Sequence, residues 1–366
     1  MLNGLLKEVL LNVGNLRLDK RAILSPMAEV TDAPLRQICR EYGAGLTFTQ
    51  MVSARGIIDN SFESLRALAF SRDEKPIGVQ LITDEPEYLR KAIKEIKPYQ
   101  PDLIDLNCGC SVPHVCKYGL GAAILDKPDL LAELVSTMKE AAGDIPVSIK
   151  LRLGRDKNNI TVLRNAKIVE ENGASLITIH ARTRNQSYAE EPDWQWIKKV
   201  KDEVKIPVVG NGNLFSTEDC IKMINETGCD YIFIARGALG NPFIFKRINS
   251  VLEKGIDPGN PDFDELYRTV LYHFDLILKE YGEEQGIIKA RKYLIWYFRF
   301  YKGIYNFIEK IYLISDRVGV EKYVQEHIQK IKENYYPDED LDKIHKSFNN
   351  RVLFWMNKNQ AIEAYN

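Results

Sequence analysis

The sequence predicts an α/β fold, a (β/α)8 TIM barrel followed by a smaller all-helical C-terminal domain, and three observations support this. Eight short, β-branched apolar segments recur between longer segments of helical periodicity. The 366 residues suffice for one α/β domain of about 250 residues and a second of about 100. From residue 266 on, apolar residues recur at helical spacing without strand-like alternation. Eight strands joined by helices favour a closed barrel over an open sheet.

The strands are expected at residues 23–25, 47–49, 77–80, 103–107, 147–152, 176–180, 208–210 and 231–235. Helices are expected between them at residues 32–43, 84–97, 129–142, 160–173, 193–203 and 216–227, whereas residues 53–74 show the least certain pattern. Asp32, Asp84 and Ser216 stand where they would cap the helices that follow, Ser216 in a capping box with Asp219. Residues 13–22 predict a small hairpin that plugs the bottom of the barrel.

Glycine, proline and acidic residues concentrate between residues 255 and 265, which is the composition of a linker. We therefore expect a barrel domain in residues 1–254 and a helical domain in residues 265–366. No internal repeat beyond the βα unit and no low-complexity tract interrupts either part.

The composition is that of an ordinary globular protein, with 45% hydrophobic and 28% charged residues. No apolar run approaches the roughly 20 residues that cross a bilayer, and the amino terminus lacks the features of a secretory signal. We therefore expect a cytoplasmic protein with no membrane partner and no obligate protein partner, whose six cysteines are free thiols. The net charge of −1 gives no general attraction to nucleic acid, so any RNA contact requires a local basic patch.

Polar residues fall at the ends of six predicted strands, where the loops of a parallel barrel form the active-site mouth. These residues are Gln80, Asn107, Lys150, His180, Asn211 and Arg236. Taken singly, a lysine is usually a solvated charge and a histidine a satisfied structural residue. Six strands that aim polar groups at one rim instead predict a binding site.

The loops after the last two strands carry small residues, in GNGN (210–213) and ARG (235–237). Small residues let backbone N–H groups approach an anion, and barrels frequently bind a phosphate at these two loops. The glycines could also serve tight turns alone. Lys150 and Gln80 supply partners for the carbonyls and nitrogens of a flavin ring. FMN therefore fits these residues better than a free sugar phosphate.

The segment DLNCGCSVP (105–113) leaves the fourth strand and can present a thiol over the mouth. Cys108, Cys110 and Cys116 do not have a spacing typical of zinc or iron–sulfur sites, so no metal is expected. A nucleophilic cysteine would use a neighbouring base such as His114, whereas a proton donor needs only a thiol that stays protonated near neutrality. The second role suits a reductase better.

Together these residues resemble the dihydrouridine synthase family, the flavoenzymes that reduce uracil in tRNA. The resemblance spans residues 23 to about 245 and is carried by SPMAEVTD (25–32), VQ (79–80), DLNCGC (105–110), SIKLR (148–152), TIHARTR (178–184), GNGN (210–213) and IARG (234–237). It implies that the flavin ring and its phosphate are held by Pro26, Met27, Ala28, Gln80, Lys150, His180, Asn211, Gly212, Asn213, Ala235 and Arg236.

The resemblance also implies two residues that act on the substrate. Asn107 would orient the uracil, and Cys110 would be the acid that protonates it. The family usually has proline after this cysteine, where this chain has Ser111. Cys108 is the alternative donor.

The segment GIIKARKYLIWYFRFYKG (286–303) holds five cations and no acid, interleaved with aromatic residues. Basic groups can hold phosphates while aromatic rings stack on bases. An amphipathic core helix with snorkelling cations has the same pattern. The family binds tRNA through a helical tail with a similar basic run, so Arg291 and Lys292 are expected to bind the substrate.

The resemblance implies that the chain reduces the C5=C6 bond of specific uridines in tRNA, with NADPH or NADH as electron donor. No dinucleotide-binding glycine fingerprint is present, so the nicotinamide nucleotide would visit the same mouth in turn. Two alternatives stay open: an FMN-dependent barrel reductase of a free pyrimidine or dihydro-orotate, and a non-catalytic RNA-binding relative.

Overall fold

The computed structural model describes residues 11–335, and these residues form two compact units. The first contains the chain up to Gly237 and the segment Phe245–Asp257, and the second contains Ala238–Ile244 and the chain from Pro258 on. The stretch Ala238–Ile244 thus belongs with the helical unit, although it precedes the expected linker. The first ten residues, considered above for a secretory signal, and the part of the expected helical domain beyond residue 335 lie outside the described residues.

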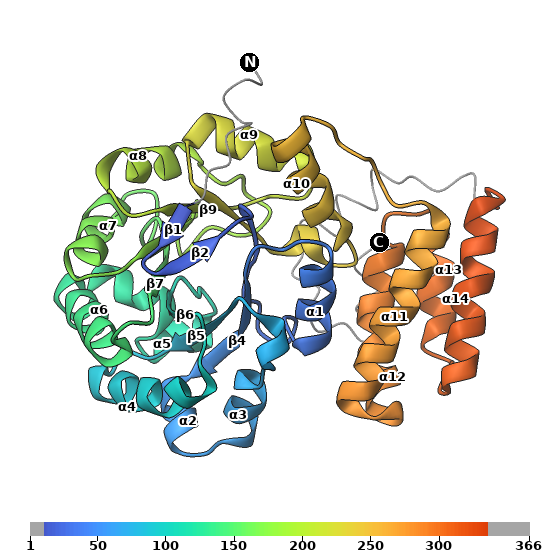
Figure 1. The fold of residues 1–366 in the computed structure, drawn as a ribbon, viewed down its shortest axis with the longest axis horizontal. Coiled ribbons are helices and arrows are strands. Elements are labelled where there is room, and N and C mark those ends of the chain that lie inside the picture. Colours follow the sequence, from blue (N-terminus) through green and yellow to red (C-terminus); the bar gives the residue numbers. More distant parts are fainter. Residues whose placement is uncertain (1–10, 336–366) are drawn as a thin grey trace. The chain divides into compact units, whose positions relative to one another are not determined.

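The first unit is a barrel of eight parallel strands, which confirms the predicted fold class (Figure 1). In chain order the strands are β3 (Ala22–Leu24), β4 (Thr47–Ser53), β5 (Ile77–Ile82), β6 (Leu103–Cys108), β7 (Val147–Arg152), β8 (Leu176–His180), β9 (Val208–Asn211) and β10 (Tyr231–Ile234). From β4 to β10 each strand pairs with the next, and β10 pairs with β3. The ring closes between β3 and β4, where the N–H of Leu24 donates to the carbonyl of Leu46 at 3.0 Å and that of Gly45 to Ala22 at 2.8 Å.

Helices return the chain on the outside of the barrel (Figure 1). The predicted helices correspond to α1 (Ala33–Glu41), α4 (Pro86–Ile96), α6 (Pro128–Ala142), α7 (Val162–Glu171), α8 (Gln195–Glu203) and α9 (Thr217–Thr227). Helices without a counterpart in the prediction are α2 (Ala54–Ile58), α3 (Phe62–Leu68), α5 (Pro113–Lys117) and α10 (Phe243–Lys254). Short 3₁₀ helices occur at Arg72–Glu74, Lys97–Tyr99, Gly121–Asp126 and Arg236–Ala238. The helices α2, α3 and α5 are too short to show a helical period, whereas the apolar residues of α10 do recur at helical spacing.

The bottom of the barrel is closed by the predicted hairpin, formed by β1 (Leu11–Val13) and β2 (Leu16–Leu18) (Figure 1). Val13 and Leu18 are buried in one hydrophobic cluster with the barrel residues Ile23, Leu46, Phe48, Leu103, Leu176, Val209, Tyr231 and Phe233. Within this cluster the rings of Phe48 and Phe233 meet edge to face, with centroids 5.4 Å apart. Gly78 makes room for them, because a Cβ there would lie 2.4 Å from the Phe48 ring. The hairpin prediction is confirmed, and this end of the barrel is a packed core.

Two of the three predicted helix caps are confirmed. The carboxylate of Asp32 accepts a hydrogen bond from the N–H of Leu35 at 3.1 Å, and Ser216 forms a capping box with Asp219. The predicted Asp84 cap is wrong, because α4 begins without any side-chain cap bond. This helix starts with a proline, whose missing N–H leaves one donor fewer for a cap to satisfy.

The second unit contains, within the described residues, the helices α11 (Phe263–Tyr281), α12 (Glu283–Phe298), α13 (Ile304–Ile311) and α14 (Arg317–Lys332). Gly240 lies so close to α12 that a Cβ there would be 2.1 Å from the carbonyl carbon of Trp296. Asp262 and Asp316 cap α11 and α14 through their side chains. Across residues 11–335, no helix is both long enough and apolar enough to cross a membrane.

Candidate active site

Alternate residues of neighbouring barrel strands point inward and form polar layers towards the carboxyl ends of the strands. The buried polar residues of β5 to β8 in this arrangement are Gln80, Asp105, Asn107, Ser148, Lys150, Arg152, Thr178 and His180. The register places Asp105 beside both Gln80 and Ser148, and Lys150 beside Asn107. Because the layers stack, residues that are far apart in sequence meet below one mouth.

The buried carboxylate of Asp105 anchors a chain of side-chain hydrogen bonds across three strands. Its two oxygens accept from Ser148 Oγ at 2.5 Å and from Gln80 Nε2 at 2.7 Å. Gln80 Oε1 in turn accepts from Asn107 Nδ2 at 2.9 Å. Burial raises the pKa of Asp105 to about 7, against the opposing effects of its two hydrogen bonds and of Lys150.

Asn107 continues this chain into the loop that carries Cys110. Its Oδ1 accepts from the backbone N–H of Gly109 at 3.0 Å and of Cys110 at 2.8 Å. The carbonyl of Cys110 accepts from the N–H of Ala122 at 2.9 Å and from Cys116 Sγ at 3.3 Å. The side chain of Cys110 is half-buried, and its backbone is held on both sides.

The other residues considered for the thiol chemistry are less suitable. Cys108 is fully buried, and burial raises the pKa of its thiol. His114 is exposed on α5, where its ring meets the edge of Tyr118 with centroids 5.0 Å apart. All six cysteines are free. These positions favour Cys110 over Cys108 as the thiol that faces a bound substrate.

Lys150 is a buried cation that lacks a partner in the described part of the chain, where its ammonium makes no hydrogen bond or ion pair. Burial lowers the pKa of Lys150 to about 8; Arg152 lowers it further, and Asp105 opposes both effects. His180 is buried beside the same cations, so its pKa lies well below the usual value and its ring is neutral at pH 7. This part of the mouth is deficient in negative charge.

Arg182 and Arg236 converge on Asn213, whose Oδ1 accepts from both guanidinium groups at 2.9 and 2.8 Å. The Arg236 guanidinium carbon lies 4.7 Å from the centre of the Tyr188 ring, and this ring stacks on His180 at 6.1 Å. Burial lowers the pKa of Arg236 to about 10, and the neighbouring Arg182 contributes to the shift. Two further cations thus lie beside the predicted phosphate loops.

The turns after β9 and β10 have the form that an anion site requires. Gly212 adopts φ 138°, which strains any other residue. Among the described residues, no acceptor faces the backbone N–H of Gly212 or Asn213. In the second turn, a Cβ on Gly237 would lie 2.1 Å from the carbonyl oxygen of Leu214. The predicted residue Asn211 also braces this region, because its side chain donates to the carbonyl of the neighbouring strand β10 at 2.9 Å.

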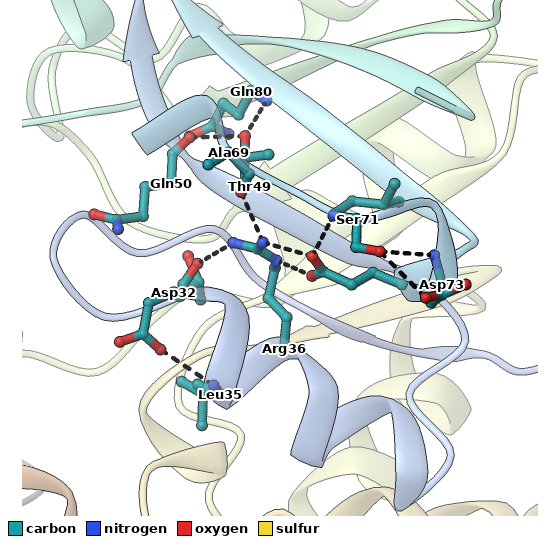
Figure 2. Close-up of polar contacts among 12 residues, drawn as sticks. Asp32, Leu35, Arg36, Thr49, Gln50, Ala69, Ser71, Asp73 and Gln80 are labelled. Atoms are coloured by element: carbon teal, nitrogen blue, oxygen red, sulfur yellow. Dashed lines mark hydrogen bonds and ion pairs between the residues drawn. The ribbon is translucent and has the colours of Figure 1, made fainter. Parts of the chain in front are cut away.

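The loop of residues 26–28, expected to line a flavin through its backbone, is held by a buried ion pair. Arg36 of α1 lies at the centre of Figure 2 and donates to Glu74 at 2.6 and 3.0 Å. It also donates to the carbonyl of Thr31 at 2.9 Å, and Thr31 Oγ1 accepts from the N–H of Met27 at 3.1 Å. Arg36 and Glu74 are only 1% and 8% exposed, so this support is rigid.

Arg291 and Lys292 lie in the helical unit. Arg291 donates to the carbonyl of Ile314 at 3.0 Å, and the Lys292 ammonium lies 4.9 Å from the centre of the Tyr293 ring. The aromatic residues of α12, including Trp296, are buried. The rings of α12 therefore form helical core and not a stacking surface for bases, while the two cations remain half-buried.

Residues in the mouth or in the layer below it to which the sequence prediction gave no role are Asp105, Arg152, Arg182 and Tyr188. Arg152 donates to the carbonyls of Gly109 at 2.9 Å and Thr183 at 2.6 Å, and so links two rim loops. Asp105, Arg152 and Arg182 lie within the motifs quoted for the resemblance, and this was the available signal. Tyr188 stands in a polar loop and has no signal in the sequence.

These features fit a flavin that carries a phosphate. The unpaired Lys150 ammonium suits the electron-rich edge of the ring, and the open N–H groups of Gly212 and Asn213 suit the phosphate. In residues 11–335, no group of three or more histidine, cysteine or acidic side chains has the arrangement of a metal site. The parallel barrel and its basic, buried rim are those of a (β/α)8 enzyme, a class that frequently binds a phosphate at the loops after the last two strands.

The comparisons with known proteins identify one family. The family model of dihydrouridine synthase (Dus) matches residues 23–333. A probable tRNA-dihydrouridine synthase of Rickettsia conorii is 34% identical over 325 residues, which cover 88% of this chain and 98% of that protein. tRNA-dihydrouridine synthase B of Pasteurella multocida is 35% identical over 287 residues, which cover 78% and 86%. The chain therefore belongs to the dihydrouridine synthase family, as its motifs indicated.

Solved structures share this fold. The 6-hydroxypseudooxynicotine amine oxidase from Pseudomonas geniculata N1 superimposes with a TM-score of 0.53 and 17% identity, over 70% of this chain and 50% of that chain. The likeness concerns the barrel architecture alone.

Proposed function

We propose that this chain reduces the C5=C6 bond of specific uridines in tRNA to 5,6-dihydrouridine, with FMN as its cofactor and NADPH or NADH as electron donor. Membership of the dihydrouridine synthase family makes the chain a flavin-dependent oxidoreductase, and relatives that align over most of their length are named for a tRNA substrate. The observation that carries the finer assignment is that a half-buried thiol, Cys110, and an unpaired buried ammonium, Lys150, share one barrel mouth.

Different residues of the mouth would bind different parts of the cofactor. When bound, FMN supplies a hydride to the base. Lys150 and Gln80 hold its ring, and the ammonium stabilises negative charge on the reduced ring. The backbone of residues 26–28 supports the ring, and its phosphate and remaining polar atoms are held by His180, Asn211, Gly212, Asn213, Ala235 and Arg236.

The substrate needs one proton from the protein. Because C5=C6 is conjugated with the C4 carbonyl, addition of hydride at C6 moves negative charge towards C5. The Cys110 thiol donates the proton at C5, and Asn107 orients the uracil. The base must leave its stack to enter the mouth, which costs a few kcal/mol and favours uridines in disturbed loops.

The helical domain, residues 265–366, would bind the tRNA. Arg291 and Lys292 supply positive charge for phosphates, which does not depend on a stacking surface. A tRNA substrate favours a cytoplasmic location.

Absorbance tests the proposal directly. The purified chain should be yellow, should bleach with NADPH, and should regain its colour with unmodified tRNA as dihydrouridine forms. Colour restored by a free pyrimidine or by orotate, which would be reduced to dihydro-orotate, and not by tRNA, would favour the alternative reductase. A colourless chain that retains RNA would make it a binding protein.

A further inference from the structure

The hydrogen-bond chain Asp105–Gln80–Asn107–Cys110, here called the amide relay, has a fixed direction. At one end stands a carboxylate, which can only accept when ionised, and at the other stand backbone N–H groups, which can only donate. Each amide between them must turn its NH2 group towards Asp105 and its oxygen towards Cys110. The observed distances of 2.7, 2.9 and 2.8 Å along the relay are those of good hydrogen bonds.

The direction of the relay decides what the two amides can offer to bound molecules. An amide nitrogen carries two hydrogens, and the relay uses one hydrogen of Gln80 and one of Asn107. The remaining N–H of each is a donor, which matches the carbonyl oxygens of a flavin ring and of uracil. If the two amide groups were flipped, the NH2 group of Asn107 would face the backbone N–H groups of Gly109 and Cys110, and no hydrogen bond could form there.

We propose that Asp105 is a positioning residue for the reaction, which holds Gln80 and Asn107 in the donor orientation and through Asn107 fixes the Cys110 loop. This inference rests on the proposed function. Asp105 is fully buried and lies one layer below the mouth, so it acts through the relay and does not touch the substrate. Its bond to Gln80 is charge-assisted, and such bonds are about twice as strong as neutral ones.

The loop has a particular need for this support. The residue after Cys110 is Ser111, so the backbone lacks the restriction that proline would impose. The carbonyl oxygens of the loop are fixed from outside the relay, by Arg152 at Gly109 and by Ala122 at Cys110. Its two N–H groups depend on Asn107 alone among the described residues.

The test compares two substitutions at the same carboxylate in the full-length, flavin-loaded protein. Asp105→Asn removes the charge from the bond to Gln80, whereas Ser148→Ala removes the other hydrogen bond of Asp105 and leaves the relay intact. Hydrogen exchange at the amides of Gly109 and Cys110 reports on the end of the relay without any turnover. Asp105→Asn should speed this exchange about fivefold to tenfold and slow flavin reoxidation by tRNA by a similar factor. Ser148→Ala should change both by less than twofold.

If Asp105→Asn and Ser148→Ala change the exchange rates equally, Asp105 has only a structural role and the proposal is wrong. Unchanged amide exchange in Asp105→Asn would also overturn the proposal. If Asp105→Asn does not fold, Gln80→Met cuts the relay at its next link and must speed the same exchange. Wild-type protein that fails to reduce tRNA uridine would contradict the proposed function, while the exchange comparison would still decide on the relay.

Discussion

In the barrel mouth, the Lys150 ammonium is buried with its pKa lowered to about 8 and has no partner among residues 11–335. In α12, Lys292 and Arg291 are half-buried, and their charges rest on an aromatic ring and a backbone carbonyl. A cation buried without a counter-charge carries a desolvation cost that a bound anion would offset. A cation that snorkels along an aromatic core is already stabilised where it lies. Environment, and not charge alone, therefore distinguishes the two basic regions.

The largest effect should come from the thiol that shares the mouth with Lys150. Cys110→Ala should suppress dihydrouridine formation by on the order of 10²–10⁴ and leave flavin reduction by NADPH nearly intact, because only the uridine step needs an acid. Stopped-flow absorbance separates the two steps. Cys108→Ala is the matched control and should do much less, since that thiol is fully buried. The opposite ranking would mean that Cys108 is the acid.

A second effect should distinguish the mouth cation from the cations of α12. Lys150→Ala should weaken flavin retention or slow flavin reoxidation by tRNA by on the order of 10², the usual loss for a buried electrostatic contact to developing charge. Lys292→Ala should leave both quantities unchanged. Flavin content and single-turnover rates measure this. Normal values in the Lys150 variant would remove Lys150 from the site.

The pH dependence should show two limbs. Above a pKa of about 8, Lys150 loses its proton and its stabilising charge, so reoxidation by tRNA should slow with rising pH. Below a pKa of about 7, Asp105 becomes protonated and loses its charge-assisted bond, so the rate should also fall with falling pH. The alkaline limb should approach about tenfold per pH unit, whereas the acid limb should level off at about the fivefold to tenfold slowing expected of Asp105→Asn, and the apparent pKa values belong to the interacting pair. If the reoxidation rate of Lys150→Ala still falls at alkaline pH, another group is responsible for that limb.

The smallest effect is expected in α12. Reversal of Arg291 and Lys292 to Glu should weaken tRNA binding about fivefold at low salt and flatten its salt dependence, because fewer phosphate contacts release fewer counterions. Reversal of the exposed Arg317 and Lys322 on α14 to Glu provides a matched double charge reversal outside this segment. Binding measured at several salt concentrations would show the difference. Identical curves for both variants would leave α12 with a structural role only.

The strands and the rim were predictable because alternation and strand ends are local properties of the sequence. The positions of Asn107 and Lys150 near the ends of their strands follow from the local sequence alone. The support of the site was not predictable in the same way. Arg36 and Glu74 are 38 residues apart and meet only through the fold. The direction of the amide relay likewise requires the register of the two strands β5 and β6, which neither segment specifies alone.

The aromatic stripe of α12 shows the limit of pattern alone. Tyr293 and Trp296 alternate with cations, which suits both a nucleic-acid surface and a helical core. Burial decides between the two, and both rings are 1% exposed. Tyr188 shows the converse, because an isolated aromatic residue in a polar loop lies against Arg236 and His180 at the mouth.

The hairpin of β1 and β2 seals one end of the barrel with a packed cluster. In the described part of the chain, this leaves the mouth at the carboxyl ends of the strands as the entrance to the polar layers. On the proposed function, the nicotinamide nucleotide has to depart before the uridine arrives, and the two never occupy the site together. Steady-state kinetics should accordingly be ping-pong, with parallel double-reciprocal lines and with excess NADPH competing against tRNA.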